Sequence, residues 1–258
     1  MRATTSFLVA LALLSAACGT ATNSVASVWA SDANPEITPP PPTPGPSSLA
    51  WKACGEPGER FECATLTVPL DHDAPHGPTI DLAVIRLPAP PAATRLGSLV
   101  VNPGGPGGSG VEFVRAAAVD TFPTELRTRF DIVGFDPRGV GTSRPITCGG
   151  SAGDLLALDL APDDDGERRA VLNAAQRTAR DCQVTDGAVL PHVSTADVAR
   201  DLDLLRAALG DAKLTYVGYS YGTFIGSSYA ALYPDRVRAL VLDGAVDPAL
   251  DLVGRARG

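Results

Sequence analysis

The chain has little of what nucleic-acid and metal sites depend on. Its 258 residues include 21 lysines and arginines against 29 aspartates and glutamates, a net charge of −8. The basic residues are dispersed, which argues against nucleic-acid binding. None of the five cysteines belongs to a Cys-x-x-Cys pair, so we expect no metal site, and no motif indicates a cofactor. The length suits one α/β domain.

Histidine is also scarce. The chain has three histidines, His72, His76 and His192, and all of them precede Ser220. His72 and His76 lie in a turn rich in Asp, Pro and Gly at 71–78, where we expect them to be exposed. His192 comes just before the start of a predicted helix, where we expect a packing or capping role. We therefore expect none of the three to be a catalytic base.

Long hydrophobic runs are missing too. The apolar run Phe7–Leu14 is too short for an ordinary transmembrane helix. Its basic start and the small residues after it predict an export signal over residues 1–18. Lipidation of Cys18 would give a cell-surface lipoprotein that meets the membrane only through its anchor. Ordinary cleavage after Ala17 or Ala30 would instead give a secreted protein.

A change of composition follows this signal. Residues 19–49 are rich in Pro, Ser and Thr, which favours an extended spacer and leaves too little apolar surface for a core. Residues 50–258 have the alternating apolar segments of a folded domain. We assign this part to an α/β domain.

The most informative motif is Gly218–Gly222, with the sequence Gly-Tyr-Ser-Tyr-Gly. It lies between an apolar strand, 214–217, and a helix rich in small residues, 223–233. A Gly-x-Ser-x-Gly between strand and helix is the nucleophile elbow of an α/β-hydrolase, because the turn is too tight for side chains at the flanking positions. This context predicts Ser220 as a nucleophile.

A second motif, Asn102–Gly110, follows another apolar strand at 98–101. An acyl-transfer enzyme must stabilise an oxyanion with backbone N–H groups. In this fold one donor is the residue after the nucleophile, here Tyr221, and the other comes from the loop after the third strand, here Gly105. The competing interpretation, a phosphate-binding loop, lacks the Gly-Lys-Ser/Thr that it requires.

A third segment, 130–143, is predicted to be a strand that ends in a glycine-rich turn. We interpret Asp136 and Arg138 as a structural pair that holds this turn.

With these motifs in order, the chain resembles the secreted tripeptidyl aminopeptidases and their proline-iminopeptidase-like relatives among the α/β-hydrolases. The resemblance begins near Trp51 and includes 63–71, 102–110, 130–143 and the elbow. It implies a serine peptidase that removes short peptides from substrates with a free N-terminus. It also implies the bridge Cys148–Cys182, while Cys54 and Cys63 are close enough in sequence for a local bridge; disulfides agree with export.

The resemblance also shows what these residues do not supply. In α/β-hydrolases the acid and the histidine follow the nucleophile, yet no histidine follows Ser220. Asp243 is a candidate acid at the end of the next strand, although the resemblance places the acid beyond residue 258. We therefore expect a truncated chain in which the C-terminal strands and the cap are missing, and in which 248–258 begin a helix.

The expected architecture is a mostly parallel sheet with flanking helices. The expected strands are 61–70, 79–87, 98–102, 130–135, 214–219 and 237–242, and the expected helices are 111–118, 195–209 and 223–233. The leading function is an exported exopeptidase that forms an acyl-enzyme on Ser220. The alternatives are an esterase or amidase of the same fold, or a catalytically dead fragment.

Overall fold

The computed structural model describes residues 49–91 and 94–247. The expected signal peptide with Cys18, nearly all of the spacer and the expected helix after residue 247 lie outside the described residues.

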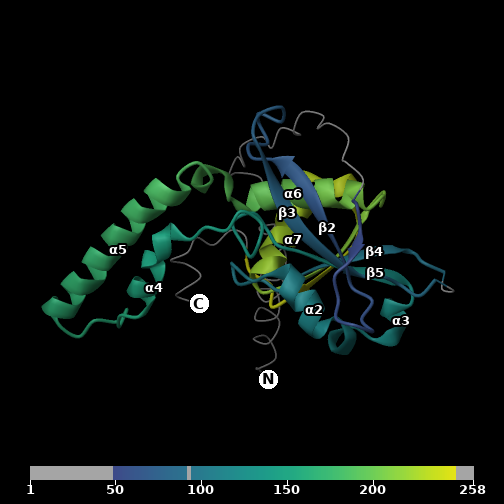
Figure 1. Cartoon of the computed structure of the whole chain (residues 1–258), viewed down its shortest axis with the longest axis horizontal. Helices are drawn as coiled ribbons and strands as arrows, with labels where there is room; N and C mark the ends of the chain where they lie inside the picture. The colour runs from purple at the N-terminus through teal and green to yellow at the C-terminus, as the bar shows by residue number, and fades with distance from the viewer. Residues whose placement is uncertain (1–48, 92–93, 248–258) are drawn as a thin grey trace, which may run out of the picture. The chain divides into compact units, whose positions relative to one another are not determined.

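A seven-stranded mixed sheet organises this part of the chain, in the order β1-β2-β3-β5-β4-β6-β7 (Figure 1). Its strands are β1 (Lys52–Ala53), β2 (Glu62–Pro69), β3 (Thr79–Leu87), β4 (Gly97–Asn102), β5 (Phe130–Phe135), β6 (Leu214–Tyr219) and β7 (Val237–Asp243). The β1–β2, β2–β3 and β3–β5 pairs are antiparallel. The pairs from β5 through β4 and β6 to β7 are parallel. The expected mostly parallel sheet is confirmed for its central and C-terminal part.

The helices lie between these strands along the chain. They are α2 (Gly110–Thr121), α3 (Thr124–Arg127), α4 (Ser151–Leu156), α5 (Asp165–Asp186), α6 (Thr195–Ala208) and α7 (Tyr221–Leu232), with short 3-10 turns η1 (Cys148–Gly150), η2 (Leu190–His192) and η3 (Pro234–Arg236). Ser194 caps α6, and its hydroxyl accepts from the Asp197 amide in a reciprocal capping box. The three expected helices are confirmed, whereas α3, α4 and α5 were not predicted.

Two apolar clusters cover the two faces of the sheet because successive strand residues point to opposite sides. Val100, Val133 and Tyr216 pack in one cluster with buried residues of α6 and α7, such as Leu202 and Ile225. Their chain neighbours pack in the other cluster with α2; these are Leu99, Val101, Ile132 and Val217. The strands are therefore buried on both faces, which explains why they are nearly continuous apolar runs.

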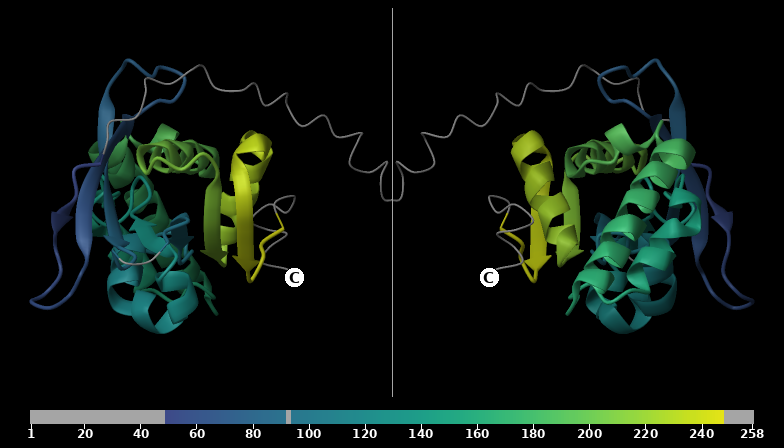
Figure 2. Two further views of the ribbon diagram at one scale, coloured as in Figure 1. Left: turned by 90° about the vertical axis from the view of Figure 1, so that its right-hand side faces the viewer. Right: turned by 90° about the vertical axis from the view of Figure 1, so that its left-hand side faces the viewer.

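Helices α4 and α5 lie side by side in the long connection between β5 and α6 (Figure 1). At the other end of the described chain, β7 is the last strand of the sheet, next to β6 (Figure 2). None of the helices in the described part combines the length and the hydropathy that a bilayer span requires.

Candidate active site

The elbow motif forms the turn that connects β6 to α7. Ser220 is at φ 50° and ψ −120°, a backbone conformation that is strained for a residue with a side chain. Its amide donates to the Asp243 carbonyl at 2.8 Å, and its carbonyl accepts from the Thr223 amide and hydroxyl. These contacts hold Ser220 exposed at the carboxyl end of the sheet, where a substrate can reach it.

Close packing explains why glycine is needed in this turn. A Cβ added to Gly218 would lie 2.4 Å from the Gly222 carbonyl oxygen, so a side chain there would force the strand and the helix apart. The buried Tyr216 hydroxyl donates to the same carbonyl at 2.9 Å. Burial raises the pKa of Tyr216, which keeps this hydroxyl protonated as the donor.

The Asn102–Gly110 loop lies directly against the elbow because β4 and β6 are neighbouring parallel strands. Asn102 is paired in register with Gly218, so both loops leave the same edge of the sheet. A Cβ on Gly104 would lie 2.3 Å from the Tyr219 carbonyl oxygen and 3.1 Å from the Ser220 Cβ.

Hydrogen bonds within this loop use some of its backbone donors and leave others, the Gly105 amide among them, without an acceptor in the described part of the chain. The Gly104 amide donates to Asn102 Oδ1 at 2.9 Å, and the Gly108 amide donates to the Gly104 carbonyl at 3.1 Å. In the described part of the chain, the amides of Gly105 and Tyr221 have no acceptor, and Gly105 is exposed. The geometry is thus compatible with both amides as donors to a bound anion.

Asp136, directly after the end of β5, has a buried carboxylate that holds the end of the glycine-rich loop in place. It accepts the Ser109 hydroxyl at 2.5 Å, the Val111 amide at 3.2 Å and the Thr142 amide at 3.1 Å. Asp136 therefore joins the start of α2 to the turn after β5. The predicted pairing of Asp136 with Arg138 is wrong: the partners of this carboxylate are two backbone amides and a hydroxyl, and the Arg138 guanidinium donates elsewhere.

Arg138 instead pairs with Asp201 of α6, and both side chains are fully buried. Its Nε and one Nη2 hydrogen donate to the two Asp201 carboxylate oxygens at 2.7 and 2.6 Å. The other Nη2 hydrogen donates to the Pro69 carbonyl, and Nη1 donates to the carbonyls of Leu70 and His192. All five guanidinium hydrogens are therefore used within the protein.

His72 completes this cluster. Its Nε2 lies 2.9 Å from Asp201 Oδ1 and 3.0 Å from Arg138 Nη2. Because both Nη2 hydrogens have other acceptors, we assign the proton of the imidazole to His72 Nε2, which then donates to Asp201 Oδ1. The expected exposure of His72 is wrong: the side chain is buried because the carboxylate of a distant helix accepts its N–H. His76 is exposed, as expected.

A pocket of about 180 Å³ adjoins the elbow and the glycine-rich loop. It lies between two groups of residues. One group, from the elbow and the loop after β4, is Asn102, Gly104, Pro106, Gly107 and Tyr221; the other, from the segments after β5 and around α6, is Pro137, Arg138, Gly139, Val140, Ile146, Val193 and Val198. The Tyr221 hydroxyl is tied to the Thr195 hydroxyl at 2.8 Å, which fixes the ring at the side of the pocket.

A candidate acid lies near Ser220, but none of the described histidines does so as a hydrogen-bonding base. Asp243 is exposed at the end of β7 and touches Ser220 through its backbone carbonyl. Asp243 is paired in register with Tyr219, the residue before Ser220. Burial and, next, the charge of Asp243 raise the pKa of Tyr219. No histidine hydrogen-bonds to Ser220 in the described part of the chain.

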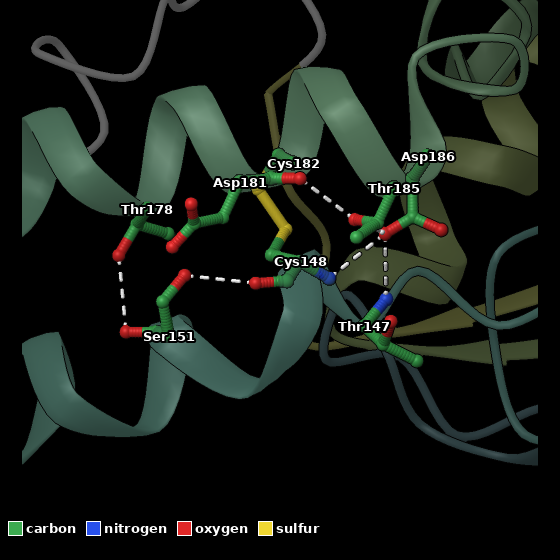
Figure 3. The surroundings of a disulfide bond; sticks show 8 residues. All are labelled: Thr147, Cys148, Ser151, Thr178, Asp181, Cys182, Thr185 and Asp186. Carbon is green, nitrogen blue, oxygen red and sulfur yellow. Dashed lines mark hydrogen bonds between the residues drawn. A yellow bond between two sulfur atoms is a disulfide. The ribbon is translucent and has the colours of Figure 1, made fainter.

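Both expected disulfides are present, Cys54–Cys63 and Cys148–Cys182. Figure 3 shows the second one between η1 and α5, beside Asp186. Within residues 49–91 and 94–247 no group of three or more His, Cys, Asp or Glu side chains could hold a metal ion.

A strained serine between a parallel strand and a helix, with a glycine-rich loop from the neighbouring strand, defines the α/β-hydrolase class. Residues 97–254 match the model of the family described as the alpha/beta hydrolase fold. The chain belongs to this family.

Three relatives show which members of the α/β-hydrolase family this chain is similar to. The serine protease Hip1 of Mycobacterium tuberculosis is 49% identical over 193 residues, 73% of this chain and 36% of that protein. A tripeptidyl aminopeptidase of Streptomyces coelicolor is 40% identical over 214 residues, 80% of this chain and 40% of that protein. Carboxylesterase B of Mycobacterium tuberculosis is 39% identical over 222 residues, 81% of this chain and 42% of that protein.

The predicted resemblance to the peptidase branch of the α/β-hydrolases is confirmed by these relatives. The chain spans about two fifths of the length of the curated relatives it matches.

Proposed function

We propose that this protein is an exported serine hydrolase and that Ser220 is its nucleophile. The observation that carries the proposal is the backbone of Ser220, strained at φ 50° and exposed between β6 and α7. Such strain persists only where the surrounding structure enforces it, and it is concentrated at functional sites. The Ser220 hydroxyl oxygen would attack the scissile carbonyl carbon, and the leaving amine would depart with a proton as the acyl-enzyme forms.

The amides of Gly105 and Tyr221 are the proposed oxyanion donors. Both are without an acceptor among the described residues, and Gly104 brings the loop against the Ser220 Cβ. Preorganised donors of this kind are often the largest single contribution to acyl transfer.

The general base is proposed to come from outside these 258 residues. His72 is committed to Asp201, and all three histidines precede Ser220 in the chain. The orienting carboxylate is proposed to come from outside as well, with Asp243 as the candidate within the chain because of its position beside the elbow.

The proposed reaction is the release of short peptides from the free N-terminus of a peptide substrate, in line with the relative that is named a tripeptidyl aminopeptidase. The relative named carboxylesterase B favours the second candidate, an esterase or amidase of the same fold. The chain by itself would be catalytically dead if nothing supplies the base.

The proposed location is outside the cytoplasm, either at the cell surface through a lipid on Cys18 or as a secreted protein. The support is the predicted signal over 1–18 and the two disulfides, which persist mainly in oxidising compartments. A spacer over 19–49 would then separate the folded part from the membrane.

Labelling with a fluorophosphonate tests the nucleophile. We expect labelling of a protein that includes the base, and its loss in Ser220→Ala. Ser227→Ala is the matched control, because Ser227 is on α7, which begins directly after Ser220, and its hydroxyl donates to the Phe224 carbonyl. Labelling that persists in Ser220→Ala, or that fails when the rest of a full-length relative is joined to this chain, would refute the assignment.

A further inference from the structure

The pocket beside the elbow has a chemistry that the proposed reaction leaves unassigned. Its far side is formed mainly by apolar side chains, among them Val140, Ile146, Val193 and Val198. Val198 is buried and the other three are half-buried. The pocket is therefore suited to a group without charge or strong polarity.

The pocket suits an uncharged group even though Arg138 is among its lining residues. Arg138 lines the pocket, yet all five of its hydrogens are donated to Asp201 and to three carbonyls. Asp201 neutralises its charge at 2.6 Å with both side chains fully buried. An entering carboxylate would find no free donor on this guanidinium, and an entering cation would find no unpaired carboxylate.

The position of the pocket indicates which part of a substrate it would receive. Gly104 and Tyr221 line the pocket. Tyr221 follows Ser220 and supplies one proposed oxyanion donor, and Gly104 precedes the other, Gly105, and lies against the Ser220 Cβ. A scissile carbonyl held there carries its own side chain on the adjacent carbon atom. That side chain is the first substituent able to enter the pocket.

The size sets an upper bound on the occupant. A volume of about 180 Å³ is close to that of an engineered apolar cavity of about 150 Å³ that binds benzene. A leucine-sized or phenyl-sized group is therefore within range. Glycine would leave the pocket empty and would forgo the burial of apolar surface.

We propose that this pocket, which Tyr221 and Ile146 both line, is the specificity pocket for an uncharged apolar side chain on the residue that contributes the scissile carbonyl. The proposal rests on the proposed function and deepens it. Ile146 is the proposed specificity-determining residue, because it is the largest of the half-buried aliphatic side chains that line the pocket and it packs beside Gly139, where an added Cβ would lie 3.0 Å from its Cδ1.

The first experiment measures binding and needs no catalysis. N-acetyl-leucinamide, N-acetyl-glycinamide and N-acetyl-lysinamide are titrated into isotope-labelled protein, and the methyl resonances of Val140, Ile146, Val193 and Val198 are followed by NMR. We expect saturable shifts with the leucine compound alone. No shift with that compound, or equal shifts with the lysine compound, would overturn the proposal.

The second experiment measures selectivity in a protein that the fluorophosphonate labels at Ser220. Ile146→Phe fills the pocket and should reduce the ratio of kcat/KM for leucine over glycine substrates by about tenfold or more. Ile146→Ala should shift the preference toward larger side chains. Leu172→Phe is the control, because Leu172 is exposed on α5, and it should leave the ratio unchanged.

Together the two experiments distinguish failure of the serine-hydrolase assignment from failure of the specificity-pocket proposal. Loss of labelling together with retained leucine binding would refute the serine-hydrolase assignment and keep the pocket. Labelling together with a leucine-to-glycine ratio that is the same in all three variants would keep the nucleophile and refute the specificity pocket.

Discussion

Removal of the buried Arg138 charge should destabilise the fold severely. In Arg138→Met, the Asp201 carboxylate would keep the His72 N–H as its donor from this cluster and lose both guanidinium hydrogen bonds. Three backbone carbonyls would lose their arginine donors as well. Breaking a buried ion pair by removing one partner costs about 3–5 kcal/mol.

That loss is large against the whole stability of a domain, which is typically about 5–15 kcal/mol. For a domain of this size it corresponds to a decrease in Tm of roughly 6–20 °C. Urea unfolding followed by circular dichroism gives the free energy directly, provided that the m-value stays the same.

A double variant identifies the cause of the loss. Asp201→Leu alone should also cost several kcal/mol, because it strands the guanidinium charge. Arg138→Met combined with Asp201→Leu should cost clearly less than the sum of the two single changes, since it removes both charges at once.

A surface pair provides the matched control. Arg168 and Asp165 lie 4.0 Å apart, with side chains 65% and 84% exposed, and Arg168→Met should change stability by less than about 0.5 kcal/mol. The reasoning would be refuted if Arg138→Met cost less than about 1 kcal/mol, or if high salt removed most of its effect as it does for exposed pairs.

Four further changes test other parts of the structure. Hydrogen bonding from the Cys148 amide lowers the pKa of the Asp186 carboxyl, which stabilises the fold above the ordinary carboxyl pKa of about 4, and this gain is lost as the pH falls through the lowered value. Asp186→Asn should therefore lower the urea midpoint at neutral pH, and the difference from the parent should shrink in acid; a constant difference would contradict this. Cys148→Ser should cost about 3–4 kcal/mol in the chain-entropy model, because the bridge closes a loop with a sequence separation of 34, and reductant should destabilise the parent more than this variant. Gly104→Ala places a Cβ 2.3 Å from the Tyr219 carbonyl oxygen and should slow fluorophosphonate labelling by about 100-fold or more, whereas an unchanged rate would exclude this loop from the site. Leu202→Ala, at a fully buried position of α6, should cost about 2–5 kcal/mol in urea unfolding.

The strands and the elbow could be predicted because their signals are local. The strand over 214–219 was predicted with the bounds that β6 has, since a two-sided apolar run between turn residues has few other interpretations. Glycine at position 218 is likewise dictated by a contact within five residues, that with the Gly222 carbonyl, whereas Gly222 is required by a distant one, because a Cβ there would lie 2.7 Å from the Asn102 carbonyl oxygen.

Helix α5 was missed for a physical reason. Of its 22 residues only Ala174 and Asp186 are buried, so no apolar stripe marks it in the sequence. Its local start signals were nevertheless present. The Asp164 side chain accepts from the Glu167 amide at the N-cap, and acidic residues fill the first turn.

Charged partners were the least predictable feature. Arg138 was paired with its near neighbour Asp136, but its partner Asp201 is 63 residues away, and His72 meets the same carboxylate across 129 residues. Both contacts depend on how α6 packs on the sheet, which no local pattern records. The same limit applies to the candidate site: backbone constraints within a few residues predict Ser220 as the nucleophile, whereas no local pattern around Ser220 indicates which residue would serve as its base.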